Sequence, residues 1–292
     1  MKNKLITIFL CLALALTLTG CSAQPTETVP NSPQTGTTVT TTTPTESTTK
    51  PPAETPPQTE TPKPTETETP PQTSTTPEEI TSTDTLLRCT ASSLNVRKGA
   101  GTSYAVVGTL DKGDMVMPIS KSDGWYEIWY LGGSAYISAS YVEEATFEKA
   151  NDKIEQVIAE GKKLLGIPYV YGAQRYHFGN GSLNSAYDGK SYDCSSLMQY
   201  IFKIGANVNL AMTSREQSLQ GKEITRANIR RGDLLFFTNA SRFNNTGLER
   251  IGHVALYLGD NIILHTASDH AVIEPISDVR NSYFITARRL ID

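Results

Sequence analysis

Residues 192–202 read Tyr192-Asp193-Cys194-Ser195-Ser196-Leu197-Met198-Gln199-Tyr200-Ile201-Phe202. From Leu197 onward, large apolar residues recur at the spacing of one helix face. Asp193 and the serines ahead of that run are residue types that start helices. We therefore expect Cys194 to open a helix, where unpaired N–H groups and the helix dipole favour its thiolate. Because free cysteine is commonly a small buried hydrophobe, the case for a reactive thiol depends on its partners elsewhere in the chain.

Two histidines are predicted to lie on one side of a hairpin far along the chain. Residues 231–237 read as a turn into a buried strand, and residues 251–266 read as two strands joined by a three-residue turn. In this register His253 stands opposite Ala267, and His265 is its diagonal neighbour on the same face. A single strand histidine is usually structural. Two on one side of a hairpin, with a helix-capping cysteine elsewhere, form the pattern of nucleophile, base and orienting group.

Length and charge limit the function classes. The 292 residues allow about two ordinary domains. The formal net charge of −4 is uneven, because residues 1–20 carry two positive charges and residues 22–84 carry nine acidic and two basic residues. Residues 85–292 are therefore close to neutral, which gives no support for nucleic-acid binding.

The N-terminus has the form of a targeting segment. Lys2 and Lys4 precede an apolar run over residues 5–18, which is short for a membrane span and typical of a secretory signal. The run ends in Leu18-Thr19-Gly20-Cys21, which resembles the lipobox of bacterial lipoproteins. The resemblance implies a signal peptide over residues 1–20 and lipid on Cys21, which would hold the protein on the outer side of a bacterial membrane. The alternative is an ordinary signal peptide with a chance cysteine.

The segment 21–84 is predicted to be a disordered linker. It consists mainly of Thr, Pro, Glu, Gln and Ser, so it cannot bury enough apolar surface to offset the entropy of ordering. It is either a spacer that lets a membrane-held enzyme extend into the cell wall, or low-complexity sequence with no length requirement. Beyond it, Cys89 and Cys194 remain as an exported pair. We expect no disulfide between them, because it would remove the nucleophile, and Cys89 is predicted to fill a small strand position.

A small all-β domain is predicted over residues 85–145. Short strands alternate with turn signals at residues 93–97, 106–110, 124–128, 133–137 and 140–142. The series resembles a bacterial SH3-like domain. The resemblance implies either binding to the cell wall or one side of an active-site cleft, and a barrel that merely packs on its neighbour is the alternative.

The second domain is predicted over residues 146–292. An amphipathic helix at residues 150–165 ends at Gly166 and Pro168. A polar insertion at residues 174–190 follows and is predicted to be a surface loop over the cleft. His177 within it is expected to be a solvated loop residue.

Four motifs in order carry a further resemblance, over roughly residues 151–292. They are Asp193-Cys194-Ser195-Ser196-Leu197, Gly232-Asp233-Leu234-Leu235-Phe236, Gly252-His253-Val254-Ala255-Leu256-Tyr257-Leu258-Gly259 and His265. Together they match the NlpC-type cell-wall endopeptidases, a papain-like family of cysteine peptidases. The fold implied is an α+β papain-like catalytic domain preceded by the SH3-like barrel and the linker.

The resemblance implies a role for each matching residue. Cys194 is the nucleophile, His253 the general base and His265 the group that orients it. An oxyanion residue and three substrate-contacting residues are also implied, namely Tyr171, Asp193, Ser195 and Ser214. Two departures concern the substrate side: Ser196 stands where the family usually has glycine, and Ala211-Met212 stands where it often has Pro-Arg, although Arg215 is close by.

The implied activity is hydrolysis of peptidoglycan stem peptides at the bond from D-γ-glutamyl to a diamino acid, usually diaminopimelate. No cofactor or metal is implied, because the candidate residues lack metal-ligand spacing. The partners expected are stem peptides and, through Cys21, a membrane; we expect a monomer at the bacterial cell surface. Three alternatives stay open: an amidase on the same scaffold, a non-catalytic wall-binding lipoprotein, and a transglutaminase-like surface enzyme.

Overall fold

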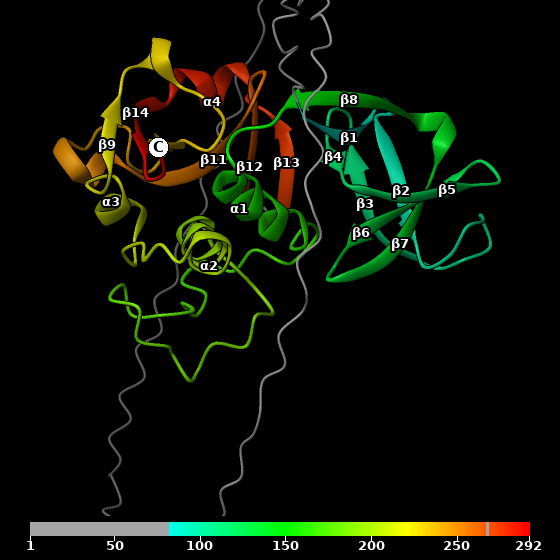
Figure 1. Cartoon of the computed structure of the whole chain (residues 1–292), viewed down its shortest axis with the longest axis horizontal. Coiled ribbons are helices and arrows are strands. Elements are labelled where there is room, and N and C mark those ends of the chain that lie inside the picture. The colour runs from blue at the N-terminus through cyan, green and yellow to red at the C-terminus, as the bar shows by residue number, and fades with distance from the viewer. Residues whose placement is uncertain (1–81, 267–268) are drawn as a thin grey trace, which may run out of the picture. The chain divides into compact units, whose positions relative to one another are not determined.

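A nine-stranded sheet of antiparallel pairs runs through the described part of the chain, which is residues 82–266 and 269–292 of this computed structural model (Figure 1). The strand order is β8-β1-β4-β13-β12-β11-β10-β14-β9. Strands of both predicted domains share this sheet, because Met115 of β4 pairs with Ile273 of β13. The predicted signal segment, the Cys21 site and the predicted linker up to residue 81 lie outside the described residues.

The first domain is the predicted SH3-like β-domain. A second sheet with the order β3-β2-β7-β6-β5 completes it. Strands β1 to β8 span Thr83–Cys89, Ser93–Arg97, Val106–Asp111, Met115–Val116, Pro118–Ser122, Trp125–Tyr130, Gly133–Ser138 and Val142–Glu148. Alternate residues of β6 are buried, as its sequence alternation predicts. Residues 139–141 form a 3₁₀ helix where a last short strand was expected.

The edges of this domain extend past the expected boundaries. β1 begins at Thr83, inside the segment expected to be linker, and β8 continues to Glu148. The two strands pair along their whole length, from Thr83 opposite Glu148 to Cys89 opposite Val142. Cys89 is buried and free, as expected, and its thiol bonds to backbone carbonyls.

The second domain places two helices against one face of the long sheet (Figure 1). The helices are α1 Asp152–Lys162, α2 Cys194–Ala206, α3 Ser214–Gln217 and α4 Asp278–Ser282, with 3₁₀ helices at Arg226–Asn228 and Gly247–Arg250. The strands are β9 Lys222–Ile224, β10 Leu234–Phe237, β11 His253–Gly259, β12 Ile262–Thr266, β13 Ala271–Pro275 and β14 Phe284–Arg289. α1 packs on α2, and α2 packs on β11 and β12. Their close approach requires Gly205, where a Cβ would lie 2.6 Å from the backbone of Val157.

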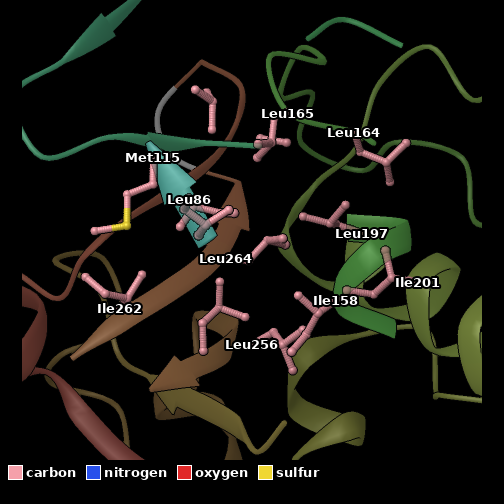
Figure 2. Packing of buried hydrophobic residues seen from close by; sticks show 14 of the residues in the cluster. Leu86, Met115, Ile158, Leu164, Leu165, Leu197, Ile201, Leu256, Ile262 and Leu264 are labelled. Carbon is pink, nitrogen blue, oxygen red and sulfur yellow. The ribbon is translucent and has the colours of Figure 1, made fainter. Parts of the chain in front are cut away.

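One hydrophobic cluster joins the two domains. Figure 2 shows Leu86 and Met115 of the first domain beside Leu256 and Leu264 of the second. Full burial of such a side chain contributes roughly 1.5–3 kcal/mol. The SH3-like domain is therefore packed into the same core as the second domain.

Buried charges cross the same boundary. Asp84 of β1 accepts from the Lys162 ammonium at 2.6 Å and from the Arg231 guanidinium at 2.7 Å. Arg231 also binds Glu155 at 2.7 Å. The pKa of Asp84 is lowered, because the two cations outweigh the effect of its burial. Each of these charges has a partner, which is the condition for burying it.

The histidine hairpin has the predicted register with a different turn. Leu256 pairs with Leu264, which is the register that the sequence predicts for the two strands. The turn is the two residues Asp260 and Asn261, both with positive φ, and a bulge between Tyr257 and Gly259 absorbs the extra residue. Across residues 82–266 and 269–292, no helix combines the length and the apolar character needed to cross a bilayer.

Candidate active site

Cys194 is the first residue of α2, and its neighbours show why the helix begins there. Oδ1 of Asp193 accepts a hydrogen bond from the Ser196 N–H at 2.8 Å, and Oγ of Ser196 accepts one from the Asp193 N–H at 2.8 Å. This reciprocal cap satisfies N–H groups that the first turn leaves without partners. The predicted helix start is confirmed, and the serine that departs from the family glycine forms half of the cap.

The Cys194 thiol is half-buried at one wall of a cavity of about 700 Å³. Burial raises its pKa to about 11, and the nearby Asp193 carboxylate acts in the same direction. Backbone hydrogen bonds from Val254 and Ser195 act in the opposite direction, so the sulfur lies between the start of β11 and the first turn of α2. At neutral pH the resting residue is therefore a thiol, and a base is needed to form the thiolate.

A chain of three side chains leads away from the cavity wall. Nε2 of His253 lies 2.9 Å from Nδ1 of His265, and Nε2 of His265 lies 2.8 Å from Oε1 of Glu274. The residues come from the adjacent strands β11, β12 and β13. His265 pairs with Val272, so Glu274 is its diagonal neighbour. We call His253, His265 and Glu274 the base relay.

The hydrogen bonds of the base relay determine which nitrogens carry protons. An ionised carboxylate only accepts, so Nε2 of His265 carries the proton that Glu274 binds. Nδ1 of a neutral His265 is then an acceptor, so Nε2 of His253 is the donor. Nδ1 of His253 is left with its lone pair, and His253 lines the same cavity as Cys194.

Burial keeps both imidazoles neutral at rest. It lowers the pKa of His253 well below its ordinary value, and the neighbouring His265 and Arg280 lower it further. Burial also lowers the pKa of His265, partly offset by the hydrogen bond to Glu274. Burial alone would raise the pKa of Glu274, but its bond to His265 and the charge of Arg280 outweigh this and lower it. The base relay therefore has an ionised carboxylate at one end and a neutral imidazole at the other.

Three tyrosines line the cavity, namely Tyr169, Tyr171 and Tyr283, and the first two differ in their exposure. Tyr171, implied by the resemblance as the oxyanion residue, is 83% exposed. Tyr169, which the sequence reading did not single out, is half-buried, and its pKa is raised by burial first and then by the proximity of Cys194. The effect of Cys194 on this pKa shows that Tyr169 lies near the thiol.

The implied substrate residues lie together on the α2 side of the cavity. Asp193, Ser195 and Ser214 all line it. Arg175 binds the Asp193 carboxylate at 2.9 Å and the Ser195 hydroxyl at 3.1 Å. Asp193 also accepts from the N–H of Gly172 and the hydroxyl of Ser195. The carboxylate is therefore fully engaged within the chain.

The insertion contributes to the site in a way that the sequence did not reveal. Nε of Arg175 donates to the carbonyl of Met212 at 2.8 Å, which brings a guanidinium to the segment that lacks the family arginine. His177 is not solvated as expected but fully buried. Its Nδ1 accepts from the Gly179 N–H at 3.0 Å, and its backbone is held by Gln199, so it has a structural role. Backbone supplies a partner for Nδ1, whereas Nε2 of His177 is buried without a hydrogen-bond partner among the described residues.

The cavity is lined from the second domain. Every lining residue among those described belongs to the range 169–283. The SH3-like domain contacts the site through the sheet, because its β4 pairs with β13, the strand that carries Glu274. Within residues 82–266 and 269–292 no group of three or more His, Cys, Asp or Glu side chains is placed to hold a metal ion.

Comparisons with known proteins agree with these two parts. Residues 166–290 match the NlpC/P60 family, and residues 92–143 match the bacterial SH3 domain. A peptidoglycan endopeptidase, RipA, from Mycolicibacterium smegmatis is 30% identical over 48% of this chain and 26% of its own length. A gamma-DL-glutamyl hydrolase from Bacillus subtilis is 28% identical over 61% of this chain and 36% of its own length.

This chain therefore matches only about a quarter to a third of the length of those two relatives. Among solved structures, an NlpC/P60 family protein from Bacillus cereus aligns with 71% of this chain and 64% of its own, with 19% identity and a TM-score of 0.39.

Proposed function

Because residues 166–290 form an NlpC/P60 domain and residues 92–143 a bacterial SH3 domain, we propose that this protein hydrolyses peptidoglycan stem peptides as a cysteine peptidase. The observation that carries the proposal is the hydrogen-bonded base relay at the wall of the cavity that Cys194 also lines. The names of the relatives, a peptidoglycan endopeptidase and a gamma-DL-glutamyl hydrolase, support a γ-glutamyl bond in the wall as the target. The bond proposed is the one from D-γ-glutamyl to a diamino acid.

In the proposed mechanism, Nδ1 of His253 takes the thiol proton as the Cys194 sulfur attacks the scissile carbonyl carbon. The tetrahedral intermediate collapses when the C–N bond breaks, and the same imidazolium gives its proton to the leaving amine. A water, deprotonated by His253, then attacks the thioester and releases the thiol and the new γ-carboxylate. His265 holds the ring of His253 and stabilises its charged form, and Glu274 holds His265 in the tautomer that this requires.

The oxyanion is proposed to form between the first turn of α2 and Tyr169. Backbone N–H groups at a helix start point toward developing negative charge. We propose the hydroxyl of Tyr169 for this role, because Tyr169 lines the cavity half-buried and the proximity of Cys194 raises its pKa. We assign Tyr171, at the exposed rim, to contact with more distant parts of the substrate. Ser195 and Ser214 are proposed to contact the peptide, and Asp193 to hold the helix start and Arg175.

The proposed location is the bacterial cell surface. The lipobox-like end of the signal segment would place lipid on Cys21, and the Thr/Pro-rich linker would let the two folded domains reach into the wall. Changing Cys21→Ser should release the protein from membranes without altering its hydrolysis of soluble fragments. Membrane retention of that variant in cell fractionation would contradict the anchor.

The test of function uses soluble chain carrying Cys21→Ser and purified muropeptides, with the products identified by mass spectrometry. We expect cleavage that leaves D-glutamate with a free γ-carboxyl, and a loss on the order of 10³-fold or more in Cys194→Ala. Comparable cleavage by Cys194→Ala would refute the thiol mechanism. Release of intact stem peptides from the glycan would instead identify an amidase.

A further inference from the structure

The cavity that holds Cys194 has a cationic lining. Four arginines line it, Arg175, Arg215, Arg242 and Arg280, against a single carboxylate, Asp193. Asp193 is bound by Arg175 and by groups of the chain around it. A substrate amine would therefore meet no free carboxylate among the described lining residues, whereas a substrate carboxylate would meet several guanidinium groups.

Three of these arginines are paired with carboxylates of the chain. Arg175 is committed to Asp193, Ser195 and the Met212 carbonyl. Arg215 and Arg242 share the exposed Glu249, at 3.4 Å and 2.9 Å. These contacts place the pair at the solvent side of the cavity.

Arg280 differs from the other three arginines because it lies close to His253 and has only weak partners in the chain. It belongs to α4, its side chain is 25% exposed, and its charge influences the pKa of His253. Among the described residues its one carboxylate contact is Glu274 at 3.5 Å, and that carboxylate already binds His265 at 2.8 Å. Nε of Arg280 is buried with no hydrogen-bond partner among the described residues.

A charged guanidinium that is partly buried and incompletely hydrogen-bonded destabilises the folded protein. Burial lowers the pKa of Arg280, which shows that its surroundings disfavour the charge. An arginine presents parallel N–H groups that match a carboxylate in a two-point contact. Binding one would satisfy donors that the folded chain leaves incompletely used.

We propose that Arg280 binds a free carboxylate of the substrate next to the scissile amide. The identity of that carboxylate rests on the proposed function: in a D-γ-glutamyl bond, the γ-carboxyl is in the amide and the α-carboxylate of the same residue is free. The site then selects stem peptides whose glutamate keeps its α-carboxylate over those in which it is an α-carboxamide.

The experiment compares two synthetic peptides that differ only in this group, the α-carboxylate and the α-carboxamide. Both peptides are tested with the soluble Cys21→Ser chain. That chain with Arg280 intact is the unchanged protein, and it is compared with the same chain carrying Arg280→Met or Arg280→Lys. Arg288→Met is the matched control, because Arg288 also has a buried Nε without a partner among the described residues but does not line the cavity. Thermal unfolding and the rate of Cys194 alkylation by a neutral reagent report whether each variant keeps its fold and its thiol.

We expect the unchanged protein to cleave the carboxylate peptide with a kcat/KM about 10- to 100-fold above that for the carboxamide, the range typical of a hydrogen bond to a charged group. Arg280→Met should lose that factor on the carboxylate peptide alone and so lose the preference. Arg280→Lys should keep part of the preference for the carboxylate peptide, and Arg288→Met should keep all of it.

The outcomes separate this proposal from the proposed function. Equal losses on both peptides in Arg280→Met, with fold and alkylation retained, would overturn it and assign Arg280 to tuning the base relay. An unchanged protein without preference between the peptides would also overturn it. Failure of the unchanged protein to cleave either peptide would instead contradict the γ-glutamyl specificity on which the proposal rests.

Discussion

Removing the carboxylate at the end of the base relay should slow hydrolysis by an amount that depends on what replaces it. Glu274 accepts a charge-assisted hydrogen bond from His265 at 2.8 Å. Such a bond contributes about 1.5–3 kcal/mol, and each 1.36 kcal/mol in the barrier is about tenfold in rate. Glu274→Gln keeps an acceptor oxygen, so we expect kcat to fall about 10-fold. Glu274→Leu cannot fix the tautomer of His265, so we expect a fall of about 100-fold.

The pH dependence has a defined sign. The hydrogen bond to Glu274 and the negative charge of its carboxylate both raise the pKa of His265, so removal of that charge in Glu274→Gln lowers the pKa. The base relay then becomes harder to protonate, and the acidic limb of kcat/KM should move to lower pH in Glu274→Gln. A substitution that only weakened the fold would lower the rate without moving this limb.

The assay is muropeptide hydrolysis across pH, with Glu223→Gln as the control because Glu223 is an exposed carboxylate of the distant edge strand β9. Combining Glu274→Gln with His265→Asn adds a test. An asparagine at position 265 has no imidazole tautomer, so the carboxylate of Glu274 no longer has a tautomer to fix. The double variant should be no slower than His265→Asn alone. Unchanged rates in a folded Glu274→Leu, or fully additive losses in the double variant, would refute the base relay.

Three further outcomes are expected. Tyr169→Phe should lower kcat about 10- to 100-fold and Tyr171→Phe only about twofold, measured on the same muropeptides; the reverse order would return the oxyanion role to the exposed tyrosine. Asp84→Asn should lower the free energy of unfolding by about 3–5 kcal/mol in urea, because it leaves buried cations without their partner, whereas Arg88→Met at an exposed pair should cost under about 1 kcal/mol. Burial raises the pKa of Asp114 to about 6, so its contribution to stability is present below about pH 4 and lost as pH rises through 6. Asp114→Asn should therefore raise the free energy of unfolding at pH 7.5 by at most about 3 kcal/mol and change it little at pH 4; equal effects at both pH values would contradict the shift.

Local rules in the sequence were enough to predict where α2 begins and which face of the hairpin carries the two histidines. The start of α2 at Cys194 follows from the capping residues Asp193 and Ser196, which act within one turn. The placement of His253 and His265 on one face follows from the two-residue period of a strand and from the hairpin turn between them. These interactions join residues close in the chain, so the amino-acid order predicts them.

The remaining parts of the site depend on contacts between distant segments. Glu274 reaches His265 because β13 pairs with β12 on one side and with β4 of the SH3-like domain on the other. Arg175 comes from an insertion that reads as a polar surface loop, and Arg280 from a five-residue helix with no motif.

The partial burial of these charged side chains could not be read from composition. Glu and Arg side chains are usually exposed, and whether one is withdrawn from solvent depends on the charge or hydrogen-bond partner that folding brings to it. The chain order therefore specifies the positions of Cys194 and of the two histidines through short-range geometry. Packing between the domains and across the sheet specifies their third partner and the charge of the cleft, because those interactions exist only once the strands are aligned.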